Sequence, residues 1–146
     1  MIQVRRILYP TDFSSYSNQA YFHAVGMAET YRASLTVVYV VTPGSPEAAR
    51  GRDYWLGQLE HVRPADQRIT VHHVLLEGDP AGEIARYAAD AGIDVIVIGT
   101  HGRTGVDRLV MGSVAEKVMR EAPCSVLVVK LAKGGGGSRA NVVSAG

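Results

Sequence analysis

Short apolar runs recur along the chain, and the segments between them repeat apolar residues every three or four positions. Continuous runs rich in Val, Ile and Leu are typical of strands buried on both faces of a parallel sheet. A further run, Ile69–Leu76, alternates apolar and polar residues, which favours a strand at a sheet edge. The continuous runs that predict buried strands are Leu35–Val41, Asp94–Ile98 and Ser125–Val129, and Val4–Tyr9 predicts the first strand.

The segments between the runs predict crossover helices. Ala20, Ala24, Met27 and Ala28 place one apolar stripe on a helix over Ser15–Tyr31. Gly78-Asp79-Pro80 supplies a turn, an N-cap and a first helical residue for a helix that ends at Gly92. A strand that alternates with a helix in this way predicts an α/β fold with a parallel sheet.

Two further helices are less uniform. Glu47–Val62 has helical spacing and directs Trp55 towards the core, although Gly51 and Gly57 weaken the pattern. Ser113 followed by Glu116 fits a capping box, and the helix it opens ends before Pro123.

Composition narrows the class of protein. The 146 residues are 47% hydrophobic and 20% charged with a net charge of +1, which favours one globular domain and argues against disorder or a nucleic-acid partner. We find no membrane-spanning run or signal peptide, so we expect a cytoplasmic protein. The expected domain covers residues 1–130, and the Gly-rich segment within 131–146 resembles a flexible tail. Cys124, the one cysteine, is expected to pack in the core rather than sense redox state.

Glycines dominate the segment after the fourth strand. Gly99, Gly102, Gly112 and Ser113 form the pattern G-x2-G-x9-G-S. This spacing is neither a P-loop nor the dinucleotide pattern G-x-G-x-x-G. A glycine-bounded loop that enters a helix N-terminus presents unpaired N–H groups and attracts phosphate.

Side chains in the same loop suit a polyphosphate. Arg103 adds a permanent positive charge, and the hydroxyls of Thr100, Thr104 and Ser113 can donate to phosphate oxygens. His101 can donate to a ligand or pack beneath the loop.

Asp12 follows the first strand in the sequence Pro10-Thr11-Asp12 and has two interpretations. Ligands of open α/β sheets bind at the carboxyl ends of strands, where Asp12 could accept a bond from a nucleoside or help to hold a metal. Alternatively, Asp12, Ser14 or Ser17 caps the helix that follows. Position alone favours neither.

The stretch GTHGRTGVDRLVMGSVAEKVMREAPCSVLVV resembles the C-terminal signature of the universal stress protein family, and the resemblance extends from about Val4 to Lys130. It implies a three-layer α/β/α sandwich of the adenine nucleotide alpha hydrolase-like type, with five parallel strands in the order 3-2-1-4-5. It also implies ATP with Mg²⁺ as the ligand and places Val40 at the adenine. The nucleotide-binding residues expected on these grounds are Pro10, Thr11, Asp12, Val40, Gly99, Thr100, His101, Gly102, Arg103, Thr104, Gly105, Gly112, Ser113, Val114 and Ala115.

In that strand order the first and fourth strands are neighbours, and the chain winds away from them in opposite directions. We therefore expect Asp12 and the Gly99 loop to meet in the crevice between their carboxyl ends. The last strand, Ser125–Val129, becomes an apolar edge, and we expect it to pair antiparallel with a second copy in a homodimer, as is common in the family.

Three functions follow from these observations. The first is an ATP-binding stress-response regulator that acts on an unidentified protein partner. The second is a slow ATPase or phosphotransferase using His101 and Asp12, for which a Ser113–His101–Asp12 triad is a weaker variant. The third is a dimeric scaffold that needs no nucleotide. We do not expect a metal site at His72 and His73, because adjacent strand residues point to opposite faces.

Overall fold

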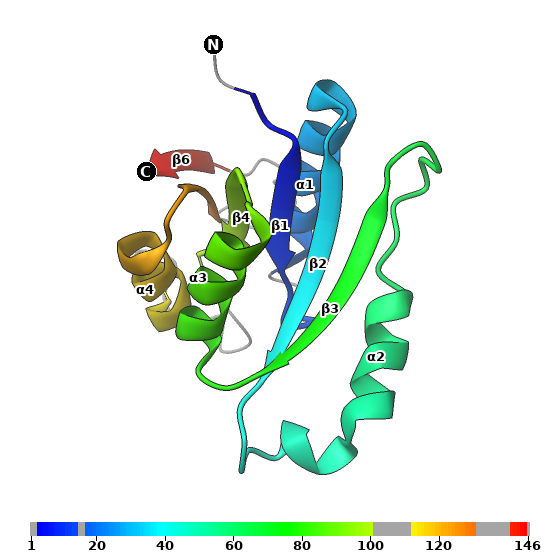
Figure 1. Cartoon of the computed structure of the whole chain (residues 1–146), viewed down its shortest axis with the longest axis vertical. Coiled ribbons are helices and arrows are strands. Elements are labelled where there is room, and N and C mark those ends of the chain that lie inside the picture. The colour runs from blue at the N-terminus through cyan, green and yellow to red at the C-terminus, as the bar shows by residue number, and fades with distance from the viewer. Residues whose placement is uncertain (1–2, 15–16, 101–111, 131–140, 146) are drawn as a thin grey trace.

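The protein, described here from a computed structural model, alternates strands and helices along residues 3–14, 17–100, 112–130 and 141–145 (Figure 1). Its first half contains β1 (Arg6–Pro10), α1 (Asn18–Tyr31), β2 (Ser34–Val41), the 3-10 helix η2 (Glu47–Arg50) and α2 (Arg52–Glu60). Its second half contains β3 (Val71–Glu77), α3 (Pro80–Ala91), β4 (Val95–Gly99), α4 (Ser113–Glu121), β5 (Ser125–Lys130) and β6 (Asn141–Ala145).

One sheet runs through the molecule in the order β3-β2-β1-β4-β5-β6. The first five strands pair in parallel, which confirms the predicted order 3-2-1-4-5 and the edge position of β3. The sixth strand differs from expectation. Residues 141–145, which the sequence predicts to belong to a flexible tail, pair antiparallel with β5. The sequence does not reveal this strand, because it has only two consecutive β-branched residues, Val142 and Val143, and follows a glycine run that is typical of a flexible tail.

Helices cover both faces of the sheet, with α3 and α4 on the near side and α1 behind it in Figure 1. Successive residues of each strand face opposite layers, so Ile7 belongs to the core cluster that includes residues of α1 and α2, whereas Leu8 belongs to the cluster that includes residues of α3 and α4. Both side chains are completely buried. Strands buried on two faces explain the continuous apolar runs in the sequence.

The predicted helix over Glu47–Val62 is broken in the structure. Gly51 has a φ of 86°, a conformation that favours glycine, and it separates η2 from α2. Trp55 of α2 is buried as expected, and its indole N–H donates to the Glu47 carbonyl over 2.7 Å. This bond holds η2 against α2, so the two short helices form one unit beside the end of β2.

The described residues include no helix that is both long and apolar enough to cross a membrane. Cys124, just before β5, is partly buried against the core under α3 and α4. Burial raises the pKa of its thiol, which keeps the thiolate population low.

Candidate functional site

A cavity of about 360 Å³ opens at the carboxyl ends of the parallel strands. Its volume falls within the range of about 300–1,000 Å³ that is usual for small-molecule sites. Ten of the residues expected to bind nucleotide line it: Pro10, Thr11, Asp12, Val40, Gly99, Thr100, Gly112, Ser113, Val114 and Ala115. The topology therefore gathers four separate segments into the crevice between β1 and β4, where the winding of an open α/β sheet reverses.

The turn after β1 contributes the polar wall. The Thr11 N–H donates to the Val38 carbonyl over 2.9 Å, which continues the sheet pairing one residue beyond β1. The Thr11 hydroxyl then accepts from the Phe13 N–H, and the Asp12 carboxylate accepts from the Ser14 N–H over 2.9 Å. Asp12 therefore stabilises this turn.

Of the three residues that the capping interpretation named, Ser17 is the N-cap of the helix and Asp12 is not. The N-cap of α1 is Ser17, which caps it without a side-chain hydrogen bond, five residues after Asp12. The Ser17 carbonyl instead accepts from the hydroxyl of Tyr9, over 3.0 Å. Burial raises the pKa of that phenol, so it stays a donor that ties the end of β1 to the start of α1.

The end of β4 and the start of α4 form the second wall. The Thr100 N–H donates to the Val129 carbonyl over 3.0 Å, and the Thr100 carbonyl accepts from the Gly112 N–H. Thr100 and Gly112 are thus held together, and the chain enters α4 directly beside the end of β4. The first N–H groups of α4, at Ser113, Val114 and Ala115, have no partner within the helix and suit an anion.

The expected capping box at Ser113 is wrong. Gly112 is the N-cap of α4, with extended backbone angles, and Ser113 is the first helical residue. The helix begins one residue earlier than predicted because a glycine N-cap needs no side-chain oxygen when a backbone bond, from Gly112 to Thr100, fixes the entry. This position leaves the Ser113 side chain exposed at the cavity.

Five expected residues, His101, Gly102, Arg103, Thr104 and Gly105, lie outside the residues that the structure describes. The proposed Ser113–His101–Asp12 triad includes one of them. Asp12 and Ser113 line the same cavity. Asp12 stabilises the turn after β1 through its bond from the Ser14 N–H, and Ser113 is the first residue of α4.

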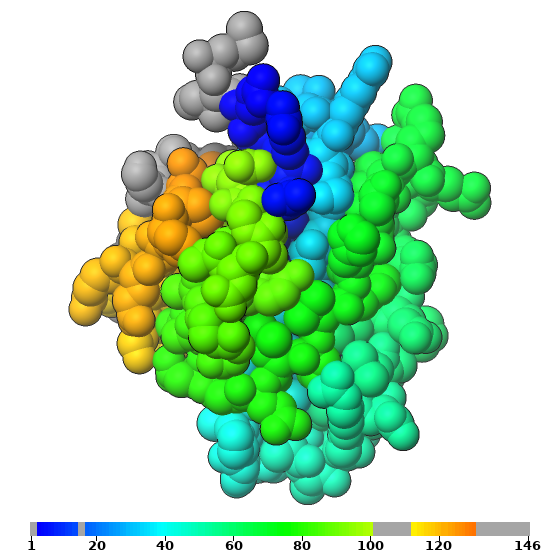
Figure 2. Space-filling view, viewed as in Figure 1, coloured from blue at the N-terminus to red at the C-terminus, as the bar shows by residue number. Residues whose placement is uncertain are grey.

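Sequence reasoning missed the polar residues that follow β2. Thr42, Ser45 and Glu47 line the cavity, and so does Tyr39 within the strand. Figure 2 shows the segment after β2, in cyan, at the lower edge of the molecule beside α3 in green. Its position after a strand's carboxyl end was the signal that could have identified it.

Helix α3 was also missed as a wall of the site. Pro80 and Ile84, from its first turns, line the cavity together with Val38 and Ile98 of the sheet, which makes this part apolar. Lys117 of α4 forms an ion pair over 3.2 Å with Asp79, the N-cap of α3. This ion pair joins the start of α3 to the middle of α4.

The charge of the described lining is negative. Asp12 and Glu47 are the acidic residues among the described lining residues, which include no Lys, Arg or His. An anionic ligand would need a cation to balance this wall.

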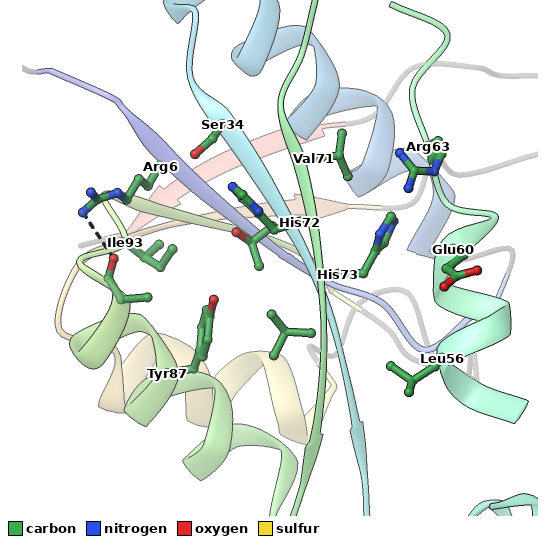
Figure 3. Close-up of a pocket in the computed structure, with 13 residues that line it drawn as sticks. Arg6, Ser34, Leu56, Glu60, Arg63, Val71, His72, His73, Tyr87 and Ile93 are labelled. Carbon is green, nitrogen blue, oxygen red and sulfur yellow. Dashed lines mark hydrogen bonds between the residues drawn. The ribbon is translucent and has the colours of Figure 1, made fainter. Parts of the chain in front are cut away.

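A second, larger hollow of about 630 Å³ lies at the amino ends of the strands and spans both sides of the edge strand β3 (Figure 3). His72 lies on the same side of β3 as Tyr87 of α3, whereas His73 lies on the opposite side with Glu60 and Arg63. His73 Nε2 lies 2.9 Å from the Val62 carbonyl. We place the candidate site at the smaller cavity, because the hollow is divided by a strand and lies at the wrong end of the sheet for ligand binding.

A doubly wound parallel sheet with a cavity at its strand reversal defines a Rossmann-like α/β protein. A profile of the universal stress protein family matches residues 3–130. The chain belongs to that family.

Proteins with similar sequences support this family assignment. Universal stress protein MJ0531 of Methanocaldococcus jannaschii is 34% identical over 142 residues, which cover 88% of this chain and 84% of the relative. A universal stress protein of Methanothermobacter thermautotrophicus is 31% identical, over 86% of this chain and 95% of its own.

Solved structures are similar to the whole domain. Universal stress protein UspA of Lactobacillus plantarum has a TM-score of 0.72 and 27% identity over 88% of this chain and 99% of its own. A universal stress protein in complex with cAMP has a TM-score of 0.68 over 88% of this chain and 98% of its own, and at 21% identity it supports the fold alone.

Proposed function

We propose that this universal stress protein binds ATP with Mg²⁺ in the cavity at the carboxyl ends of its strands. In this proposal, nucleotide occupancy regulates contact with a protein partner in the cytoplasm. The observation that carries the proposal is the convergence of four separate segments on one cavity of about 360 Å³. Sequence motifs and family resemblance together point to the same segments.

The cavity supports separate places for the two ends of a nucleotide. Asp12 and Val40 address the nucleoside, as the family resemblance implies, and the apolar side chains of Ile84 and Ile98 contact the base and ribose. The N-terminus of α4 receives phosphate oxygens, because its first N–H groups and the helix dipole favour negative charge.

The charge of the cavity supports a requirement for a cation. Asp12 and Glu47 would repel a polyphosphate, and the described lining offers no basic side chain against it. In our proposal Mg²⁺ bound to the phosphates, together with Arg103, supplies the positive charge. Mg²⁺ usually binds through phosphates and one or two carboxylates, so this donor set fits it.

The experiment is a calorimetric titration of ATP with Mg²⁺ into the full chain and into Val40→Phe. Val40 is a partly buried residue of the cavity wall, and a phenyl ring there would occupy the ligand's space. Val74→Phe is the matched control. Val74 is also partly buried against the same core, but it lines the hollow at the other end of the sheet.

We expect the wild type and Val74→Phe to bind ATP and Val40→Phe to lose at least about tenfold in affinity, equivalent to about 1.4 kcal/mol. Chelating the metal should weaken binding to the wild type. Thermal melts of both variants test whether they fold. Equal binding by the two folded variants would place the nucleotide elsewhere, and no binding by the wild type would overturn the proposal.

The same titration identifies the ligand class. Cyclic AMP, the ligand of one structural neighbour, has a single charged phosphate and should bind more weakly than ATP if the N-terminus of α4 and Mg²⁺ contact the polyphosphate. A turnover of ATP faster than about 1 s⁻¹ would favour an enzyme over a regulator.

A further inference from the structure

The antiparallel strand β6 covers an edge of the sheet that would otherwise be open. Five residue pairs join it to β5, from Val126 opposite Ala145 to Lys130 opposite Asn141. All other strand pairs in the described sheet are parallel. This strand lies beyond residue 130, where the match to the family profile ends, so it is an addition to the domain.

Without β6, strand β5 would present a row of unpaired N–H and C=O groups next to an apolar surface. With β6 in place, Val126 is 1% exposed, and Val128 and Val129 are also buried. An apolar edge with unpaired backbone groups recruits another strand.

A second copy of the chain would meet that edge in the same geometry as β6. Two identical edge strands related by a two-fold axis run antiparallel, and β6 also runs antiparallel to β5. Both occupants would use the same backbone groups of β5, so they exclude each other. We propose that β6 competes with a second copy of this chain for the free edge of β5, and that release of β6 permits dimerisation. This inference does not depend on nucleotide binding.

The segment that connects β5 to β6 favours pairing of β5 with β6 of the same chain over pairing with a second copy. Residues 131–140 join β5 to β6 and include Gly134–Gly137 and Ser138, a composition typical of a flexible linker. A short flexible linker gives a tethered strand an effective concentration in the millimolar range. A second copy at micromolar concentration therefore does not displace β6 from β5 unless the pairing of β6 is weakened.

The test weakens β6 in the full chain with the double variant Val142→Pro/Val143→Pro. Consecutive strand residues direct their N–H groups to opposite edges, so at least one of the two prolines removes a donor to β5. The matched control, Val142→Thr/Val143→Thr, retains both N–H groups and a β-branched side chain. Mass is measured by light scattering and sedimentation over a concentration series.

We expect the proline variant to dimerise with a dissociation constant at least about tenfold lower than that of the wild type and the threonine control. A proline variant that stays monomeric across the series would overturn the proposal, as would a wild type that dimerises equally well. Circular dichroism and a thermal melt of each variant show whether it is folded.

A covalent lock separates competition from a mere change in stability. Leu127 and Ser144 are opposite each other in the register, so Leu127→Cys/Ser144→Cys, in a Cys124→Ser background, can join β6 to β5. The oxidised protein should remain monomeric when the proline changes are absent, and adding Val142→Pro/Val143→Pro to it should no longer promote dimerisation. A disulfide formed between two chains instead would show that β6 is exchanged and would overturn competition within one chain.

Discussion

The ring of Phe13 stacks on the indole of Trp55, with centroids 5.5 Å apart and planes inclined by 22°. Phe13 has a φ of 63°, which is unusual for a residue with a bulky side chain. It follows Asp12 directly, so the aromatic contact joins the polar turn of the candidate site to α2. A conformation of this kind persists only where its surroundings stabilise it.

Removal of this ring should destabilise the fold. Phe13→Ala loses the contacts with Trp55 and Tyr39, and we expect the free energy of unfolding to fall by about 2 kcal/mol, less than for a fully buried ring. The control is Phe22→Ala, because Phe22 is 69% exposed and should change stability by no more than about 0.5 kcal/mol. Urea unfolding followed by circular dichroism measures both, and equal effects would contradict the role of Phe13.

Trp55 should report ligand binding. It is the single tryptophan of the chain, and its ring lies 4.7 Å from that of Tyr39, which lines the cavity. If nucleotide contacts Tyr39, its binding should change the emission of Trp55 with the same saturation curve that calorimetry gives. Val40→Phe should shift this curve to ATP concentrations at least about tenfold higher. Calorimetric binding without any change in emission would place the nucleotide away from Tyr39.

Asp79 should contribute to stability in a pH-dependent way. The hydrogen bond from the Gly82 N–H, and next the ion pair with Lys117, lower the pKa of Asp79. A lowered pKa in the folded state adds stability above the unfolded pKa of about 3.9, and that stability is lost as the pH falls through the folded value.

Asp79→Ala should therefore lower the melting temperature at about pH 7 and have a smaller effect at about pH 2.5. Asp90→Ala serves as the control, since Asp90 only pairs with Arg86 at the exposed surface of α3, over 3.4 Å. A loss of stability that is the same at both pH values would argue that Asp79 acts without its charge.

Two glycines should respond oppositely to alanine. Gly92 ends α3 with a φ of 65°, and a Cβ there would lie 2.9 Å from Arg6 Nη1. Because the arginine end can move, the backbone angle dominates, and Gly92→Ala should cost about 1 kcal/mol. Gly26, within α1, has open space around it, so Gly26→Ala should stabilise by about 0.5–1 kcal/mol. Thermal unfolding of both variants tests the contrast.

Local sequence patterns were sufficient to predict those strands and helices whose formation depends on neighbouring residues in the sequence. Apolar runs identified β1, β2, β4 and β5, which are buried on both faces, and apolar–polar alternation identified the edge strand β3. Asp79, Pro80 and Gly92 defined α3 because an N-cap bond, a fixed φ and a left-handed C-cap each depend on one residue. The glycine pattern selected two of the four segments that meet at the cavity, namely the end of β4 and the start of α4.

What the sequence by itself determined was therefore the element order, the strand order implied by family resemblance, and the short segments at the strand ends. Only the tertiary structure decided which side chains complete the cavity, such as Glu47 and Ile84, because they come from elements placed by packing rather than by their own sequence. The tertiary structure also decided that residues 141–145 form a strand, since a five-residue strand is stable only when a neighbour such as β5 supplies its hydrogen bonds.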